Sequence, residues 1–253
     1  MANFSSAYTA YYNLFYHDKN YAEEAAYVTS KIREVLPEAK NILDLGCGTG
    51  MHDVEFAKHG FSILGIDRSE NMIAIAKKNE SDQLRFCCCD AVELSTEEQF
   101  DSVVSLFHVI SYFTETEALA QCIRNVSNVL VPGGIFLFDF WYGPAVLKQR
   151  PERRVRLMQD DLFQIERIAT PAIDCTRHVV EVTYDITSKD CRTGEKHSFR
   201  EVHPMRYFFE AELIKLLTDA GFQKITFEQF LTGNTISENT WGVCCIAQQG
   251  RKK

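Results

Sequence analysis

The order of apolar and polar residues between positions 39 and 141 is typical of a parallel sheet covered by helices. Short apolar runs alternate there with longer stretches whose apolar residues recur at helical spacing. The runs predict strands at 41–45, 61–66, 84–89, 100–107 and 134–140. The stretches between them predict helices at 51–58, 69–78 and 116–130. The Pro132-Gly133-Gly134 sequence is predicted to separate the last helix from the fifth strand.

The flanking parts of the chain predict a cover and an insertion. Residues 20–36 carry one apolar helical stripe, which Pro37 ends. Later, polar and apolar residues alternate, which predicts antiparallel strands at 154–170, 178–187 and 197–207. A helix at 209–220 and strands at 223–230 and 240–247 return to the core. We therefore expect a helical cover (1–38), a core (39–145 and 208–253) and an antiparallel β insertion (146–207).

The composition excludes several classes of protein. Hydrophobic residues make up 45% and charged residues 25% of the 253 residues, which is typical of a chain that folds by itself. Residues 1–20 lack the basic start and the apolar run of a signal peptide, and no apolar run approaches the ~20 residues of a membrane span. We expect a cytoplasmic protein that does not bind membranes.

The net charge and the cysteines limit the kinds of partner and ligand that we expect. The net charge of -8 disfavours nucleic acid, because binding to a polyanion needs many Lys and Arg contacts. The nine cysteines fall mostly inside apolar runs and form no CxxC pair, so we expect buried free thiols and no metal. Four arginines lie between positions 150 and 156. Of these, Arg153 and Arg154 form either a solvated loop or a clamp for a phosphorylated small molecule.

A glycine-rich loop follows directly after the first predicted strand and precedes a helix. It reads Asp44-Leu45-Gly46-Cys47-Gly48-Thr49-Gly50. Glycines there let a ligand approach the main chain at the carboxyl edge of the sheet. A dinucleotide fingerprint would have its third glycine where Met51 stands. Asp44 would repel a pyrophosphate, but it would attract the ammonium and sulfonium groups of S-adenosylmethionine.

Two further strand ends complete a predicted nucleoside site. Asp67 ends the second strand, where a carboxylate accepts ribose hydroxyls. Asp90 and Ala91 follow the third strand and are placed to contact an adenine ring. Met72 either covers that ring or belongs to the core. The donor site is completed by the neighbouring residues Cys47, Arg68 and Phe107.

His108 follows the fourth strand and reaches the same edge of the sheet. A histidine there either orients or deprotonates an acceptor, or only hydrogen-bonds its own loop. An amine acceptor needs only to bind in its neutral form, whereas a hydroxyl needs a base. His108 and His203 are the candidates for that base.

Together these motifs resemble class I S-adenosylmethionine-dependent methyltransferases over residues 12–140. The family's glycine loop and its two nucleoside acids match Asp44, Gly46, Gly48, Gly50, Asp67 and Asp90. The resemblance implies a Rossmann-like α/β fold, with a seven-stranded sheet, helices on both faces and an inserted antiparallel β lid after strand five. It also implies methyl transfer from S-adenosylmethionine to a small-molecule acceptor, with S-adenosylhomocysteine as product.

Within that class, Tyr12-Asn-Leu-Phe-Tyr16 resembles the entry segment of nucleotide-sugar N-methyltransferases, and Asp139-Phe-Trp141 and Glu201-Val-His203 extend the similarity. In that subgroup the entry tyrosine, here Tyr16, covers the donor and the acceptor, and the inserted sheet forms one wall of the acceptor site. The resemblance therefore implies an aminosugar acceptor that Tyr16 helps to cover. With His108 from the end of the fourth strand, Tyr16 is expected to be catalytic. The residues expected around the acceptor are Tyr12, Trp141, Tyr142, Arg153, Arg154 and His203.

The sequence departs from the subgroup at His108 and at residues 232–239, which replace a basic segment. Methylation of another amine, a hydroxyl or a carboxylate, and noncatalytic binding of S-adenosylmethionine, therefore remain alternatives. A nicotinamide oxidoreductase and an RNA methyltransferase are disfavoured by the loop and by the acidic charge. A homodimer is left open.

Overall fold

The core is an α/β sheet whose first five strands are parallel. The computed structural model describes residues 5–250, so the first four residues of the expected cover and the last three of the expected core lie outside it. The core strands lie in the order β3-β2-β1-β4-β5-β11-β10. They are β1 (Asn41–Leu45), β2 (Ser62–Asp67), β3 (Leu84–Cys88), β4 (Phe100–Ser105), β5 (Leu130–Tyr142), β10 (Phe222–Gln229) and β11 (Gly242–Gln249). This arrangement confirms the predicted seven-stranded fold.

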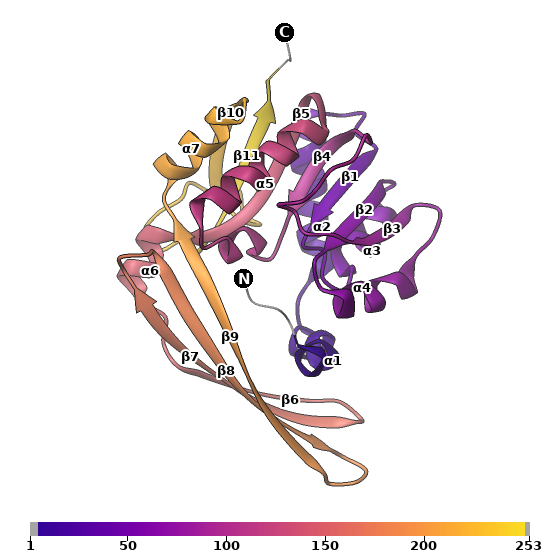
Figure 1. The fold of residues 1–253 in the computed structure, drawn as a ribbon, viewed down its shortest axis with the longest axis vertical. Helices are drawn as coiled ribbons and strands as arrows, with labels where there is room; N and C mark the ends of the chain where they lie inside the picture. Colours follow the sequence, from indigo (N-terminus) through magenta and orange to yellow (C-terminus); the bar gives the residue numbers. More distant parts are fainter. Residues whose placement is uncertain (1–4, 251–253) are drawn as a thin grey trace.

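Helices cover both faces of this sheet (Figure 1). They are α2 (Tyr21–Val35), α3 (Met51–Lys58), α4 (Glu70–Ala76), α5 (Thr116–Val129) and α7 (Glu210–Asp219), with short 3-10 helices η1 (Lys77–Asn79) and η2 (Val109–Tyr112). The apolar stripes of α2, α3 and α4 pack on one face, for example through Ile32 and Phe56. Those of α5 and α7 pack on the other, for example through Leu119 and Leu217. Each such fully buried side chain contributes about 1.5–3 kcal/mol.

Two helices have no counterpart among the predicted elements. Helix α1 (Ser6–Phe15) starts at Ser5, whose hydroxyl accepts from the Tyr8 backbone N–H, and it buries Tyr8 and Phe15 against the insertion. Helix α6 (Gly143–Gln149) follows β5 and has Pro144 in its first turn, where the missing N–H costs nothing.

The insertion is an antiparallel sheet of long strands that projects away from the core (Figure 1). It contains β6 (Arg154–Gln159), β7 (Phe163–Asp174), β8 (Val179–Asp190) and β9 (Lys196–Phe208). The expected single strand at 154–170 is wrong: it is a hairpin. Asp160 makes the turn, because its side chain accepts the backbone N–H groups of Leu162 and Phe163. The end of β5 pairs with β9, so the insertion continues the core sheet.

Two other expectations need adjustment. Strand β5 starts at Leu130 and runs through the predicted breaker, where an irregularity in its pairing with β4 accommodates the extra residues. Buried thiols are found at Cys47, Cys122, Cys244 and Cys245. The expectation is wrong for Cys87, Cys88, Cys175 and Cys191, which are exposed. Strand β3 is at an edge of the sheet, which explains the first two. No helix in residues 5–250 combines the length and apolar character that a membrane span requires.

Candidate active site

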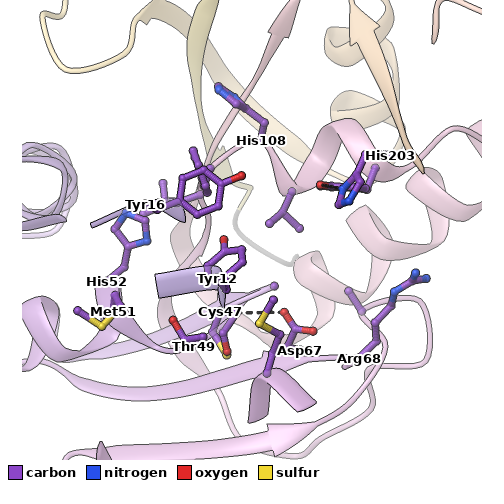
Figure 2. Close-up of a pocket in the computed structure, with 18 of the residues that line it drawn as sticks. Tyr12, Tyr16, Cys47, Thr49, Met51, His52, Asp67, Arg68, His108 and His203 are labelled. Carbon is purple, nitrogen blue, oxygen red and sulfur yellow. Dashed lines mark hydrogen bonds between the residues drawn. The ribbon is translucent and has the colours of Figure 1, made fainter. Parts of the chain in front are cut away.

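A cavity of about 290 Å³ lies at the carboxyl edge of the parallel strands and reaches the insertion sheet. Figure 2 shows Tyr12 and Tyr16 over the glycine-rich loop, with Asp67 and Arg68 on one side and His108 and His203 beyond them. The expected site residues that line this cavity are Tyr12, Tyr16, Gly46, Cys47, Gly48, Asp67, Arg68, Met72, Asp90, Ala91, Phe107, His108, Trp141 and His203. Folding thus brings together residues from five strand ends, helix α1 and the insertion.

Asp67 is held rigidly at the end of β2. Its two carboxylate oxygens accept the backbone N–H groups of Gly48 (3.0 Å) and Ser69 (2.8 Å), and the first of these bonds joins β2 to the glycine-rich loop. Burial raises the pKa of Asp67, and the two N–H groups counteract that rise. Each carboxylate oxygen keeps a lone pair for a further donor, such as a ribose hydroxyl.

The glycine-rich loop has the shape of a ligand cradle. Gly46 and Gly48 adopt φ values of +76° and +57°, which side chains disfavour. A Cβ atom on Gly48 would meet nothing closer than the Tyr12 hydroxyl, at 4.0 Å, so it would project into the cavity. A Cβ atom on Gly46 would instead lie 2.6 Å from a Val109 methyl group. Gly48 therefore keeps space free for a ligand, and Gly46 permits close packing below it.

Asp44 does not line the cavity; it lies beneath the loop, against Asp53 of α3. Burial raises the pKa of both acids, and for Asp53 it does so to about 7. Asp44 Oδ1 and both Asp53 carboxyl oxygens meet no donor among the described residues. Two buried carboxyl groups in contact do not both ionise readily, so the pair keeps at least one proton near neutral pH. The expected attraction to a cation therefore acts from behind the loop.

The end of the cavity expected to hold adenine is formed by the loop after β3 and the start of α4. Asp90 accepts the Val92 backbone N–H at 2.9 Å, which fixes its carboxylate beside Ala91 in the cavity wall. Met72 is almost fully buried and also borders the cavity, so it serves the core and the site together. Its helix begins at Ser69, whose hydroxyl accepts the Met72 N–H.

His108 is paired with Asp139, a buried residue of β5. The histidine Nδ1 lies 2.7 Å from Asp139 Oδ2, although its N–H does not point along that line, and the His108 backbone N–H donates to Oδ1 at 2.9 Å. Burial alone would raise the pKa of Asp139, but its contacts with His108 hold it below the ordinary value. Phe107 and His108 both have positive φ, a conformation that costs about 1–2 kcal/mol per residue. Such strain persists where surrounding contacts impose it, as Asp139 does here.

Tyr16 connects the loop end of the cavity to the insertion. Its ring packs edge-on against Phe107, with ring centres 4.9 Å apart. Its hydroxyl lies 3.3 Å from the hydroxyl of Tyr8 and receives a hydrogen bond of the same length from Arg167 of β7. The expected entry tyrosine thus contacts Phe107 at the end of β4 and Arg167 of the insertion.

His203 of β9 is buried in the opposite wall. Its Nδ1 lies 2.7 Å from the Tyr112 hydroxyl. Burial, assisted by the positive charge of Arg167, lowers the pKa of His203 to about 4. The ring is therefore neutral near pH 7 and is a poor proton acceptor.

Three residues expected at the acceptor lie elsewhere. Tyr142 faces the opposite side of β5 from Trp141, because successive residues of a strand alternate, and its hydroxyl donates to Glu210 at 3.2 Å. Arg153 and Arg154 are exposed at the start of β6 and do not line the cavity.

Sequence reasoning missed Asp53, Asp139 and Arg167. The sequence does mark each of them, because each is a charged residue at a position where the local periodicity predicts a buried side chain. Asp139 interrupts the apolar run of β5, and Arg167 shares the buried face of β7 with Ile165. Asp53 lies in the first turn of α3, on its buried side.

Comparison with known proteins shows the family. A model described as a methyltransferase domain matches residues 42–134, which include the glycine-rich loop, Asp67 and Asp90. The protein YqeM of Bacillus subtilis (strain 168), a candidate methyltransferase by its name, is 31% identical over 199 residues, which are 77% of this chain and 78% of YqeM. The chain is an S-adenosylmethionine-dependent methyltransferase.

Other relatives of this methyltransferase act on sugars by their names. The dTDP-3-amino-3,4,6-trideoxy-alpha-D-glucopyranose N,N-dimethyltransferase of Streptomyces venezuelae is 28% identical over 214 residues, covering 84% of this chain and 88% of that protein. The structure of SAM-bound CalS10, an amino pentose methyltransferase from Micromonospora echinaspora, has the same fold, with a TM-score of 0.77 at 22% identity and 96% coverage of both chains.

The residues present fit the methyl donor. The cradle at Gly48, the fixed carboxylate of Asp67 and the acid pair behind the loop suit a nucleoside that carries positive charge. The methyltransferase uses S-adenosylmethionine as its methyl donor.

Proposed function

We propose that this methyltransferase acts on the amine of a nucleotide-linked aminosugar. The observation that carries the proposal is the position of His108, held by Asp139, on the cavity wall between the donor end and the insertion sheet. The resemblance to the dTDP-aminosugar dimethyltransferase, over 88% of that protein's length, supports the choice of acceptor.

S-adenosylmethionine supplies an electrophilic methyl group, and an amine attacks it in line, so alignment and exclusion of water are the main tasks of the protein. Tyr16, Phe107 and Trp141 provide an aromatic lining for this purpose. Asp67 and Asp90 would hold the nucleoside of the donor. Tyr16 would position the donor and the acceptor together.

The proton of the amine goes to His108 in this proposal. Asp139 occupies the Nδ1 side of the ring, which leaves Nε2 for the substrate. A bound ammonium group has no lone pair for attack, so its proton must leave before methyl transfer, and the methylated product must lose a proton before a second transfer. His203 is unsuited to this role because of its low pKa.

Methyl transfer from labelled S-adenosylmethionine to a dTDP-aminosugar tests the proposal. The matched control acceptor is the dTDP-sugar that carries a hydroxyl in place of the amine. Mass spectrometry should show one or two methyl groups on the aminosugar and none on the control. Transfer to the hydroxyl sugar alone, or to neither acceptor, would overturn the aminosugar assignment.

We also propose that the enzyme is cytoplasmic and does not act on nucleic acid, in line with its net charge of -8. A homodimer is the assembly to test, by light scattering.

A further inference from the structure

Arg167 is a buried cation in the wall of the active-site cavity. Only 7% of its surface is exposed, and it borders the same cavity as the glycine-rich loop. Its guanidinium lies 5.1 to 5.3 Å from the ring centres of Phe15, Tyr16 and Tyr184. It donates a hydrogen bond of 3.3 Å to the hydroxyl of Tyr16.

The positive charge of Arg167 is not balanced by an ion pair within residues 5–250. None of the Asp and Glu side chains in residues 5–250 forms an ion pair with it, whereas Arg156, Arg200 and Arg206 of the same sheet pair with Asp18, Asp185 and Glu212. Tyr8 and Tyr184 do not supply a negative charge, because burial raises the pKa of Tyr184 to about 12 and holds that of Tyr8 well above its ordinary value.

Burying a guanidinium without an anion is unfavourable, and aromatic faces offset the cost only in part. The charge also affects the neighbouring His203, which it helps to keep neutral. This part of the cavity therefore favours negative charge, in contrast to the acidic donor end at Asp67 and Asp90.

We propose that Arg167 binds an oxyanion of the methyl acceptor, a phosphate or a carboxylate, through its planar fork of N–H donors. The proposal rests on the proposed function in so far as the acceptor occupies this cavity. The hydrogen bond from Arg167 to Tyr16 would join recognition of that anion to the tyrosine that faces the donor.

Calorimetry on the full chain saturated with S-adenosylhomocysteine tests the proposal. Thymidine diphosphate probes the phosphate source and 3-aminobenzoate the carboxylate source, with thymidine and aniline as their uncharged counterparts. We expect one charged probe to bind, and Arg167→Gln to weaken that probe by about 10-fold or more. Arg167→Lys, which keeps the charge over the rings, should bind with intermediate affinity.

The matched control is Arg200→Gln, an exposed arginine of the same sheet, which should bind like the parent. Affinity for S-adenosylhomocysteine should stay within about twofold in every variant, which also shows that each is folded. Three results would overturn the proposal: equal binding of the charged probe by Arg167→Gln and the parent, an equal loss for the uncharged counterpart, or no binding of either charged probe by the parent. Failure to methylate an aminosugar while Arg167-dependent binding persists would remove the acceptor assignment and leave the anion site standing.

Discussion

The acid pair beneath the glycine-rich loop predicts an unusual dependence of stability on pH. Burial raises the pKa of Asp53 from its ordinary 3.8 to about 7. An acid with a raised pKa in the folded state keeps its proton while the unfolded chain loses it. The stability contributed by Asp53 is therefore fully present below pH 3.8 and is lost as the pH rises towards 7.

The loss can be worked out at about 1.4 kcal/mol per pH unit. It is about 2 kcal/mol at pH 5 and levels off at about 4 kcal/mol by pH 8. Asp53→Asn removes the titration and leaves an amide that can donate to Asp44. The free energy of unfolding of the variant, minus that of the parent, should therefore rise by about 2–3 kcal/mol between pH 5 and pH 8.

Urea unfolding followed by circular dichroism at a series of pH values measures this difference. A constant offset from packing does not matter, because only the change with pH is predicted. Asp82→Asn, at an exposed acid, is the control and should give a flat difference. If the Asp53→Asn difference is equally flat, the two acids do not share a proton and the reasoning fails.

Other predictions concern binding, catalysis and backbone strain. Asp67→Ala should weaken S-adenosylhomocysteine binding by about 1.5–3 kcal/mol in calorimetry. Unchanged affinity would show that Asp67 does not bind the nucleoside. Asp139→Asn disturbs the proposed base, so kcat with the aminosugar should fall by about 10- to 100-fold and the pH profile of kcat should change. Affinity for S-adenosylhomocysteine should stay the same, and a pH profile like that of the parent would contradict the role of the His108–Asp139 pair. Gly46→Ala should lower Tm more than Gly60→Ala, since both have positive φ but only the former meets Val109; equal shifts would exclude the clash.

The parallel core could be predicted because its signals are local. Each strand is one apolar run and each helix one stripe, so the periodicity alone predicts β1, β2 and α3 to within a residue or two. The hairpin at Asp160 was missed because alternation continues on both sides of a turn that only the Asp160 side chain marks. Helix α1 was missed because its aromatic residues, Tyr8, Tyr11, Tyr12 and Phe15, are weak helix formers.

The residues expected to bind the methyl donor could also be predicted from the sequence. Gly46, Gly48, Asp67 and Asp90 all follow strands of one parallel sheet, whose carboxyl ends must meet. The acceptor half depends on register. Arg167 reaches the cavity only because β7 lies two strands from β9 and faces α1, and no local pattern fixes that placement. Arg153 and Arg154 were expected at the acceptor because arginines cluster there in the sequence. Clustering does not show whether the side chains point into the cavity or into solvent.

Strand β5 belongs to both sheets. It pairs with β4 and β11 along most of its length and with β9 at Trp141 and Tyr142. Asp139, which orients His108, lies only two residues before that junction. A bulky acceptor that displaces the insertion would therefore bend the strand that sets the histidine, so acceptor size and proton acceptance are mechanically linked. Variants selected for larger acceptors should then carry compensating changes where β5 pairs with β9, rather than at the far end of the insertion sheet.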